Sequence, residues 1–235
     1  MAQHDSAKDN AGIAVTAATH KRRPMRPRRS GRPTHQTAER LREHILTIAT
    51  ELFLNHGYGQ TSIEGVARRA RISKRTFYHR FADKAALFAA VVHSIIDRLH
   101  PPVDVPLISN DSLQENLLRL ARLMLRAALT PQAIALHRLI VAESARFPEL
   151  AIIASEQGGI QEAVKLVAGL LERESRLEHR VLDNPAFAAQ QFLQMVISIP
   201  QRRAMGLGKP MTSREIETWA GDTVELFLNG CGGGV

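Results

Sequence analysis

The chain has 235 residues, 44% of them hydrophobic, and a formal net charge of +8. It has no run of about 18 uncharged apolar residues, so we expect no membrane span. The single cysteine, Cys231, excludes a disulfide framework and a cysteine metal site. Because the first 20 residues also lack the pattern of a secretory signal, the cytoplasm is the expected compartment.

The positive charge is concentrated near the N-terminus. Residues 21–84 contain 16 Lys or Arg and 5 Asp or Glu, whereas residues 85–235 contain 14 and 16. A basic block followed by a slightly acidic remainder is typical of a polyanion-binding module joined to a second part. A solvated basic surface without a partner is the alternative that charge alone leaves open.

The chain begins with a segment that lacks helical periodicity. Residues 1–36 are small and polar at first and end in the basic run KRRPMRPRRSGRP. Prolines forbid a continuous helix there and like charges repel, so we expect a disordered basic arm.

From Thr37 onward the apolar residues recur with helical spacing. One helix face is predicted to carry Leu41, Ile45, Ile48, Ala49 and Leu52, ending near NHGYG. Thr61 and Glu64 match a capping box that would start the next helix, TSIEGVARRA. Asp83 is expected to start a further helix, which runs to the breaker HPPVDVP.

A short third helix is predicted within SKRTFYHRF, residues 73–81. Ser73 is a good N-cap, and Phe77 and Phe81 are four positions apart, so they form an apolar stripe. The side chains expected on the opposite face are Arg75, Thr76 and His79. Two short helices joined by a tight turn, the second basic and aromatic, fit a helix-turn-helix that reads DNA.

The exposed side chains of this segment suit different contacts. Arg75 is the candidate for guanine, because its guanidinium can bond two acceptors on one base edge. Thr76 can meet a thymine methyl or a phosphate, and Tyr78, His79 and Lys84 are better placed for phosphates. An amphipathic helix whose rings merely pack is the alternative.

The rest of the chain shows helical periodicity and no alternation typical of strands. Helical segments are expected at about 111–129, 131–147, 149–157, 160–180, 185–199 and 213–229. Thr130 and Asn184 each precede a proline, and Thr212 with Glu215 forms a capping box, so the starts are marked. The predicted fold class is all-α.

The segment GYGQTSIEGVARRARISKRTFYHRFADKAALFAAVV resembles the DNA-binding domain of the TetR family of transcriptional regulators. AERLREHILTIATELFLNHGY is similar to the first helix of that family, and RLIVAESARFPEL, residues 138–150, resembles the AefR-like subgroup of its C-terminal domains. The resemblance implies a three-helix DNA-binding domain over residues 37–84. It implies a larger helical ligand-binding and dimerisation domain over residues 85–235.

The resemblance also implies which residues touch DNA. They are Lys74, Arg75, Thr76, Tyr78, His79 and Lys84, with Thr61 or Ser62 contacting the backbone from the preceding helix. Arg71 stands where the family commonly has glycine, and Gly65 stands where a better helix former is usual. In the arm, PRRSGRP resembles a minor-groove hook and suggests contacts by Arg28, Arg29 and Arg32. A charge run that only raises non-specific affinity is the alternative.

For a ligand pocket, the candidates are polar groups on apolar helices together with adaptable apolar walls. These are His137, Glu143, Gln191, Met124, Phe147 and Met195. Dimerisation is expected through apolar faces of the last two helices, which carry Ala188, Phe192, Ile199, Ile216, Trp219, Ala220, Thr223 and Phe227. Structural roles and packing within the chain are the alternatives.

Motifs of enzymes are absent from the sequence, which has no H-E-x-x-H pair, G-x-S-x-G elbow or phosphate loop. We therefore expect no enzyme, no cofactor and no metal site. The favoured function is a homodimeric repressor of a palindromic DNA operator, released by a small-molecule effector. An architectural DNA binder without sequence preference is the alternative.

Overall fold

The computed structural model describes residues 35–99, 109, 111–157, 159–177 and 183–230. This part of the chain contains ten helices and no strand, as the periodicity predicted. The helices are α1 (His35–Gln60), α2 (Ile63–Arg69), α3 (Lys74–Tyr78), α4 (Lys84–Leu99), α5 (Leu113–Ala128), α6 (Pro131–Glu143), α7 (Glu149–Gln157), α8 (Ile160–Leu177), α9 (Pro185–Ala204) and α10 (Ser213–Asn229). Within the described ranges, no helix is both long enough and apolar enough to cross a membrane.

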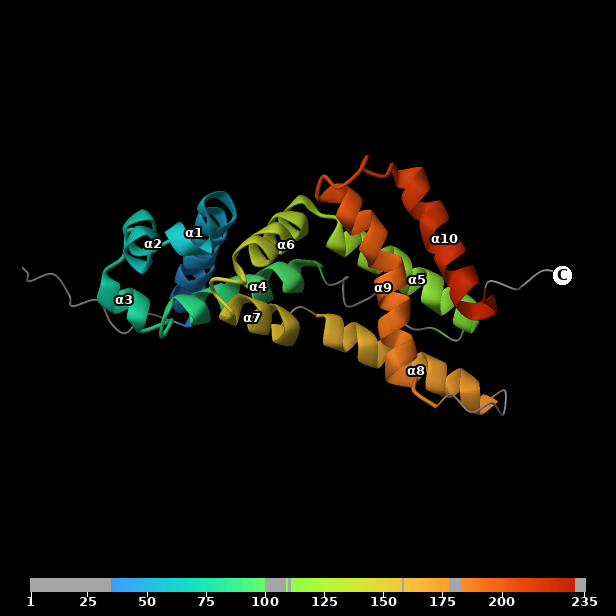
Figure 1. The fold of residues 1–235 in the computed structure, drawn as a ribbon. Coiled ribbons are helices and arrows are strands. Elements are labelled where there is room, and N and C mark those ends of the chain that lie inside the picture. The colour runs from blue at the N-terminus through green and yellow to red at the C-terminus, as the bar shows by residue number, and fades with distance from the viewer. Residues whose placement is uncertain (1–34, 100–108, 110, 158, 178–182, 231–235) are drawn as a thin grey trace, which may run out of the picture.

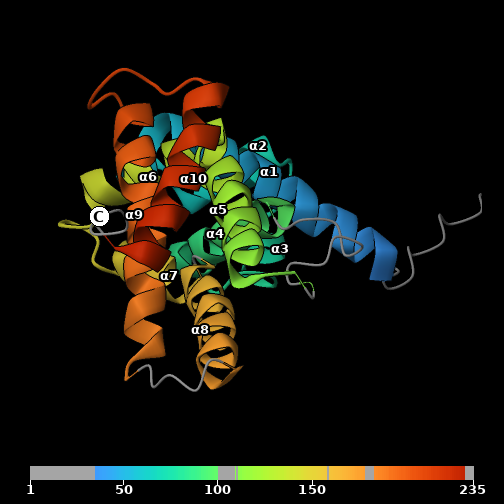
Figure 2. The same ribbon diagram turned by 90° about the vertical axis from the view of Figure 1, so that its right-hand side faces the viewer.

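The helices are arranged in two groups that meet along α4, α6 and α7. Figure 1 shows α2 and α3 at one end of the molecule and α9 and α10 at the other. Viewed from that second end, α9 and α10 cross in front, with α5 and α8 beside them (Figure 2). Helix α3 and the last two helices therefore lie far apart.

Each group has its own hydrophobic core. The first core is built from α1, α2, α3 and α4, and it also takes Leu136 and Leu139 from α6 and Leu150 from α7. The second core joins α5, α8, α9 and α10. The first core thus extends beyond the boundary predicted at residue 84, because α4 buries Phe88 and its neighbours against helices on both sides.

Helix ends follow the capping signals of the sequence. Thr130 and Asn184 cap α6 and α9, with proline at the first turn of each helix. Thr212 and Glu215 form the predicted capping box of α10. The helix expected over residues 185–199 continues through Pro200 to Ala204.

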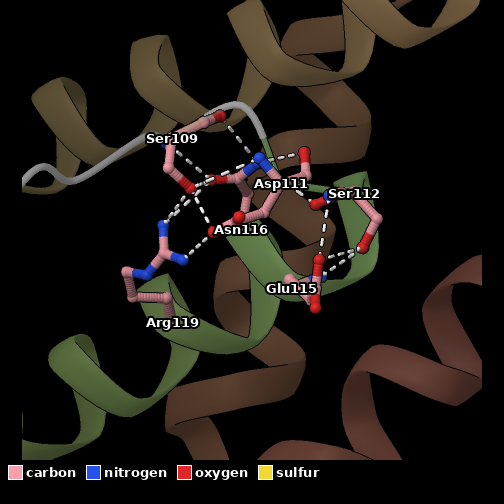
Figure 3. A network of polar contacts seen from close by, with 6 residues as sticks. All are labelled: Ser109, Asp111, Ser112, Glu115, Asn116 and Arg119. Atoms are coloured by element: carbon pink, nitrogen blue, oxygen red, sulfur yellow. Dashed lines mark hydrogen bonds and ion pairs between the residues drawn. The ribbon is translucent and has the colours of Figure 1, made fainter.

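A polar network fixes the start of α5 (Figure 3). Asn116 is buried, and its amide donates to the carbonyl oxygens of Asp111 and Ser112 while its Oδ1 accepts the N–H of Ser109 at 3.0 Å. Arg119 pairs with Asp111, whose pKa is held below its usual value by hydrogen bonds from Ser109 and Arg119. Because one buried amide forms hydrogen bonds with several backbone groups, it holds the turn before α5 in a single conformation.

Candidate nucleic-acid interface

Helix α3 is held in place by its aromatic residues. Phe77 is fully buried and Phe81 is 5% exposed, and their ring centroids lie 5.5 Å apart in the first core. Ser73 caps the helix, because its side-chain oxygen accepts the N–H of Thr76 at 3.0 Å. The predicted apolar stripe and N-cap are both confirmed. They leave the opposite side of α3 open.

The open side of α3 is basic and carries the rings of Tyr78 and His79. Lys74, Arg75 and His79 are exposed, and Tyr78 is 51% exposed while its ring packs edge-on against Phe77. Thr76 is partly buried, and its hydroxyl lies 2.8 Å from that of Ser73. Five of the predicted DNA-contacting residues therefore lie together on this short helix and its end. The arrangement offers a guanidinium, an imidazole and a phenol to a groove or to phosphates.

Lys74 already has a partner in the protein. Its ammonium group lies 2.7 Å from the carboxylate of Glu64 on α2. This hydrogen bond lowers the pKa of Glu64 and raises the pKa of Lys74. Both side chains are exposed, so the pair can open to water. Contact between Lys74 and a phosphate would replace Glu64.

The turn between α2 and α3 has a left-handed residue. Arg71 has φ 56°, and the N–H of Ile72 bonds back to the carbonyl oxygen of Ala67 at 3.0 Å. The N–H of Arg71 bonds to the carbonyl oxygen of Arg68 at 3.2 Å, which completes a Schellman-type end of α2. The family resemblance marked position 71 as one where glycine is common. The structure shows why a glycine would fit there.

The start of α2 differs from the sequence prediction by one residue. Ser62 is the N-cap, and its side chain accepts the N–H of Gly65 at 3.0 Å. Thr61 is buried and donates its hydroxyl to the carbonyl oxygen of Gly57 at 2.8 Å. The predicted capping box of Thr61 and Glu64 is therefore wrong, because Thr61 closes the end of α1 instead and Glu64 turns to Lys74. Ser62 is exposed, whereas Thr61 is not.

Lys84 points into the protein at the start of α4. Its ammonium group donates to the carbonyl oxygens of Tyr58 at 3.0 Å and Thr61 at 3.2 Å. Burial lowers the pKa of Lys84, while the charges of Glu143 and Glu149 act against this. Asp83 caps α4 as predicted, since its carboxylate accepts the N–H of Ala86 at 2.7 Å. The position of Lys84 gives it a structural role that the sequence prediction did not include.

Two further basic residues lie near the turn. Arg68 and Arg71 are exposed, and sequence reasoning did not single them out as DNA contacts. The basic run ARRAR, residues 67–71, was the sequence signal from which these two candidates could have been predicted. Arg69, between them, pairs with Glu51 at 3.3 Å. The predicted arm residues Arg28, Arg29 and Arg32 lie outside the described residues.

The six predicted ligand residues do not come together. Phe147 packs in the first core and Met124 packs in the second. Gln191 is exposed on α9, and Met195 is half-buried there. His137 is half-buried on α6, and burial lowers its pKa.

Glu143 is engaged elsewhere. Its carboxylate accepts the N–H groups of Tyr58 and Gly59 at the end of α1. A hollow of about 660 Å³ lies between α1, α4 and the α7–α8 junction, with Arg42, Ala90 and Asp97 among its lining residues. None of the six residues lines it.

The eight predicted dimer residues have mixed positions on α9 and α10. Phe192, Ala220 and Thr223 are buried inside the second core, so they pack within the chain. Ala188, Ile216, Trp219 and Phe227 are partly buried in the same core, and Ile199 is 37% exposed. The indole N–H of Trp219 donates to the carbonyl oxygen of Val196 at 2.9 Å. Other large apolar side chains are more exposed on these helices, namely Phe187 and Leu226.

Together these features define a class of protein. An all-helical chain with a helix-turn-helix at one end, whose second helix exposes basic side chains, is built as a DNA-binding regulator with a second helical part. The model of bacterial regulatory proteins of the tetR family matches residues 45–91. The model of the C-terminal domain of AefR-like transcriptional repressors matches residues 115–230. The chain therefore belongs to the TetR family of transcriptional regulators.

Individual relatives agree with this assignment. The solved structure of the flavonoid-responsive regulator FrrA is 32% identical, with a TM-score of 0.68, and the match covers 81% of this chain and 96% of that one. A TetR-family regulator from Mesorhizobium loti is 28% identical, with a TM-score of 0.62 and the same coverage. An uncharacterized HTH-type transcriptional regulator of Mycobacterium tuberculosis is 32% identical over 128 residues, which are 54% of this chain and 59% of the relative. The chain thus spans less than two thirds of that curated relative. As a member of this family the chain is a non-enzymatic, DNA-binding transcriptional regulator.

Proposed function

We propose that this chain is a homodimeric repressor that binds a palindromic operator and is released by a small molecule. The observation that carries the proposal is the two-sided α3, which buries Phe77 and Phe81 and exposes Arg75, Tyr78 and His79. A helix of this kind can enter the major groove while its apolar side stays in the protein. A regulator of bacterial DNA would act in the cytoplasm.

The last two helices support the dimer. Phe187 is 56% exposed on α9 and Leu226 is 42% exposed on α10, while Ile199 adds a third exposed apolar side chain. Helices α9 and α10 are in contact with each other, so these side chains belong to one end of the molecule. Pairing of two such helices with a symmetry mate would form a four-helix bundle and cover them.

Similarity supports repression and response to a ligand. The model that matches residues 115–230 describes repressors, and FrrA is named a flavonoid-responsive regulator. Separate cores for the α1–α4 group and for the α5, α8, α9 and α10 group allow a ligand in one part to change the orientation of the other. Of the ligand-binding residues expected from sequence, Glu143 and Phe147 lie next to Gly57 and Gly59 in the DNA-binding domain.

Binding to DNA from upstream of the chain's own gene tests the proposal. A gel shift at physiological salt should survive excess random competitor, and Arg75→Ala should weaken it by about 1–3 kcal/mol and relax one base position per half-site. Leu226→Glu should convert dimers into monomers in sedimentation and weaken operator binding, whereas Glu225→Gln serves as its exposed neighbouring control. If selection from random DNA yields no sequence preference, the protein is an architectural binder and the proposal is wrong.

A further inference from the structure

The last residue of α6 reaches across to the DNA-binding helices. Glu143 Oε1 accepts the N–H of Tyr58 at 2.8 Å, and its Oε2 accepts the N–H of Gly59 at 2.7 Å. These distances are short, as expected when the acceptor carries a charge. The bonded residues lie 85 and 84 positions from Glu143 in the chain. One carboxylate therefore holds two consecutive N–H groups just before α2.

The backbone at Gly57 presents these two N–H groups. Gly57 has φ 84° and ψ 166°, which breaks the helical backbone near the end of α1. A Cβ on Gly57 would lie 2.4 Å from Glu143 Oε1, and a Cβ on Gly59 would lie 3.2 Å from Glu143 Oε2. The positive φ and the missing space both require glycine at position 57. The contact with Glu143 thus depends on a specific local backbone.

Other bonds fix the same segment to neighbouring helices. The Tyr58 hydroxyl donates to Glu149 Oε1 on α7 at 3.2 Å, and the Tyr58 ring is 2% exposed. Burial, and then the charge of Glu149, raise the pKa of Tyr58, so the hydroxyl stays a donor. Phe147 packs edge-on against the Tyr58 ring, with centroids 5.0 Å apart. The turn before α2 is therefore held by α6 and α7 as well as by α4.

Helix α6 also contacts the end of α9 through one exposed side chain. Arg138 Nη2 donates to the carbonyl oxygen of Ala204, the last residue of α9, at 3.1 Å. Arg138 and Glu143 are five residues apart on the same helix, which is about 7.5 Å along its axis. Helix α6 thus connects the end of α9 with the turn that precedes α2 and α3 (Figure 1).

We propose that Glu143 is a positioning residue that fixes the orientation of the helix-turn-helix relative to α9, and so sets the half-site separation that the dimer accepts. The inference rests on the proposed function, because only a dimer on paired half-sites has a separation to set. Glu143 acts through the backbone of Tyr58 and Gly59, whereas base preference comes from α3. Loss of the Glu143 carboxylate should leave the preferred bases unchanged and widen the range of half-site separations that the dimer binds. One base pair changes the separation of two half-sites by about 3.4 Å.

Binding of the full-length protein to operators of different spacing tests this inference. Half-sites selected by the wild-type protein are placed at separations that differ by single base pairs, and the affinity for each is measured. Glu143→Gln keeps the size of the side chain but turns an amide donor toward one of the two N–H groups. Glu143→Asp keeps the charge but is one methylene shorter, so it provides a second variant if the first does not fold. Glu156→Gln removes an equal charge from an exposed position on α7 and is the control. Circular dichroism checks folding.

The expected result is a narrow spacing profile for the wild type and for Glu156→Gln, with about tenfold weaker binding one base pair away from the optimum. In Glu143→Gln and Glu143→Asp, the loss of affinity one base pair away from the optimum should be several-fold smaller than in the wild type. The base preference of each half-site should stay the same. A folded variant at position 143 with the wild-type profile would overturn the inference but leave the dimeric operator function standing. Failure of the wild type to select paired half-sites would overturn both.

Discussion

Lys84 Nζ lies 4.3 Å from the centroid of the Tyr58 ring and donates a hydrogen bond to the Tyr58 carbonyl oxygen at 3.0 Å. This contact ties the first residue of α4 to the end of α1. The family resemblance implies that Lys84 contacts DNA. The structure shows that Lys84 also packs α4 against the end of α1.

Replacing Lys84 should therefore lower stability as well as DNA affinity. Lys84→Met removes two hydrogen bonds from a charged donor and a cation–π contact, and we expect a loss of about 1.5 kcal/mol in the free energy of unfolding. Urea denaturation measures this, with Lys165→Met on the exposed side of α8 as the control. Unchanged stability together with weaker DNA binding would show that Lys84 serves phosphate contact alone.

Arg71 in its left-handed conformation is expected to cost stability. A left-handed backbone costs a non-glycine residue roughly 1–2 kcal/mol, and glycine avoids this cost. Part of the gain in stability is lost, because glycine makes the unfolded chain more flexible. Arg71→Gly should therefore raise the free energy of unfolding by about 0.5–1 kcal/mol. Chemical denaturation compares it with Arg71→Ala, which keeps the unfavourable φ. Equal stabilisation by both changes would mean that the arginine charge, not the backbone, carries the cost.

Asn116 should be among the polar residues most sensitive to substitution at the start of α5. Asn116→Ala leaves the N–H of Ser109 and the carbonyl oxygen of Asp111 without their side-chain partner, whereas the carbonyl oxygen of Ser112 keeps the backbone N–H of residue 116. We expect a loss of about 1–3 kcal/mol in the free energy of unfolding. The midpoint of thermal or urea unfolding measures it. Gln114→Ala, on an exposed position of the same helix, should change stability by less than about 0.5 kcal/mol. A similar effect of both changes would show that the network in Figure 3 adds no specific stability.

The half-buried His137 should make stability depend on pH. Because burial lowers its pKa in the folded protein, the unfolded chain binds more protons below about pH 6.5. Stability should consequently fall as the pH falls through this range, and His137→Gln should reduce the decrease. Urea midpoints at neutral and mildly acidic pH compare the two proteins, with the exposed His44→Gln as control. An unchanged pH profile in His137→Gln would contradict the expected role.

Local features were predictable from the sequence because neighbouring residues determine them. Ser73, Phe77 and Phe81 define a capped two-sided helix through spacing alone, and the caps of α6, α9 and α10 were found in the same way. The start of α2 was missed by one residue, since Thr61 and Ser62 are equally good caps and only the contact of Thr61 with Gly57 decides between them.

Contacts between distant segments could not be obtained in this way. Periodicity identifies an apolar face but not the helix that covers it, so Phe192 and Ala220 were assigned to a dimer although α9 and α10 bury them in their own core. Glu143 was selected as a pocket residue because it is polar among apolar neighbours. The partners of Glu143 are the backbone N–H groups of Tyr58 and Gly59. The sequence around position 143 gives no sign of this contact.

Helices α6 and α7 contribute side chains to the first core, and this matters when the protein is divided into fragments. A fragment that ends with α4 would lack Leu136, Leu139 and Leu150, which complete the core around α1 and α4. Such a fragment would expose apolar surface to water and tend to aggregate. Chimeric regulators that graft these reading helices onto another sensor should therefore carry α6 and α7 with them, or redesign the surface those helices cover.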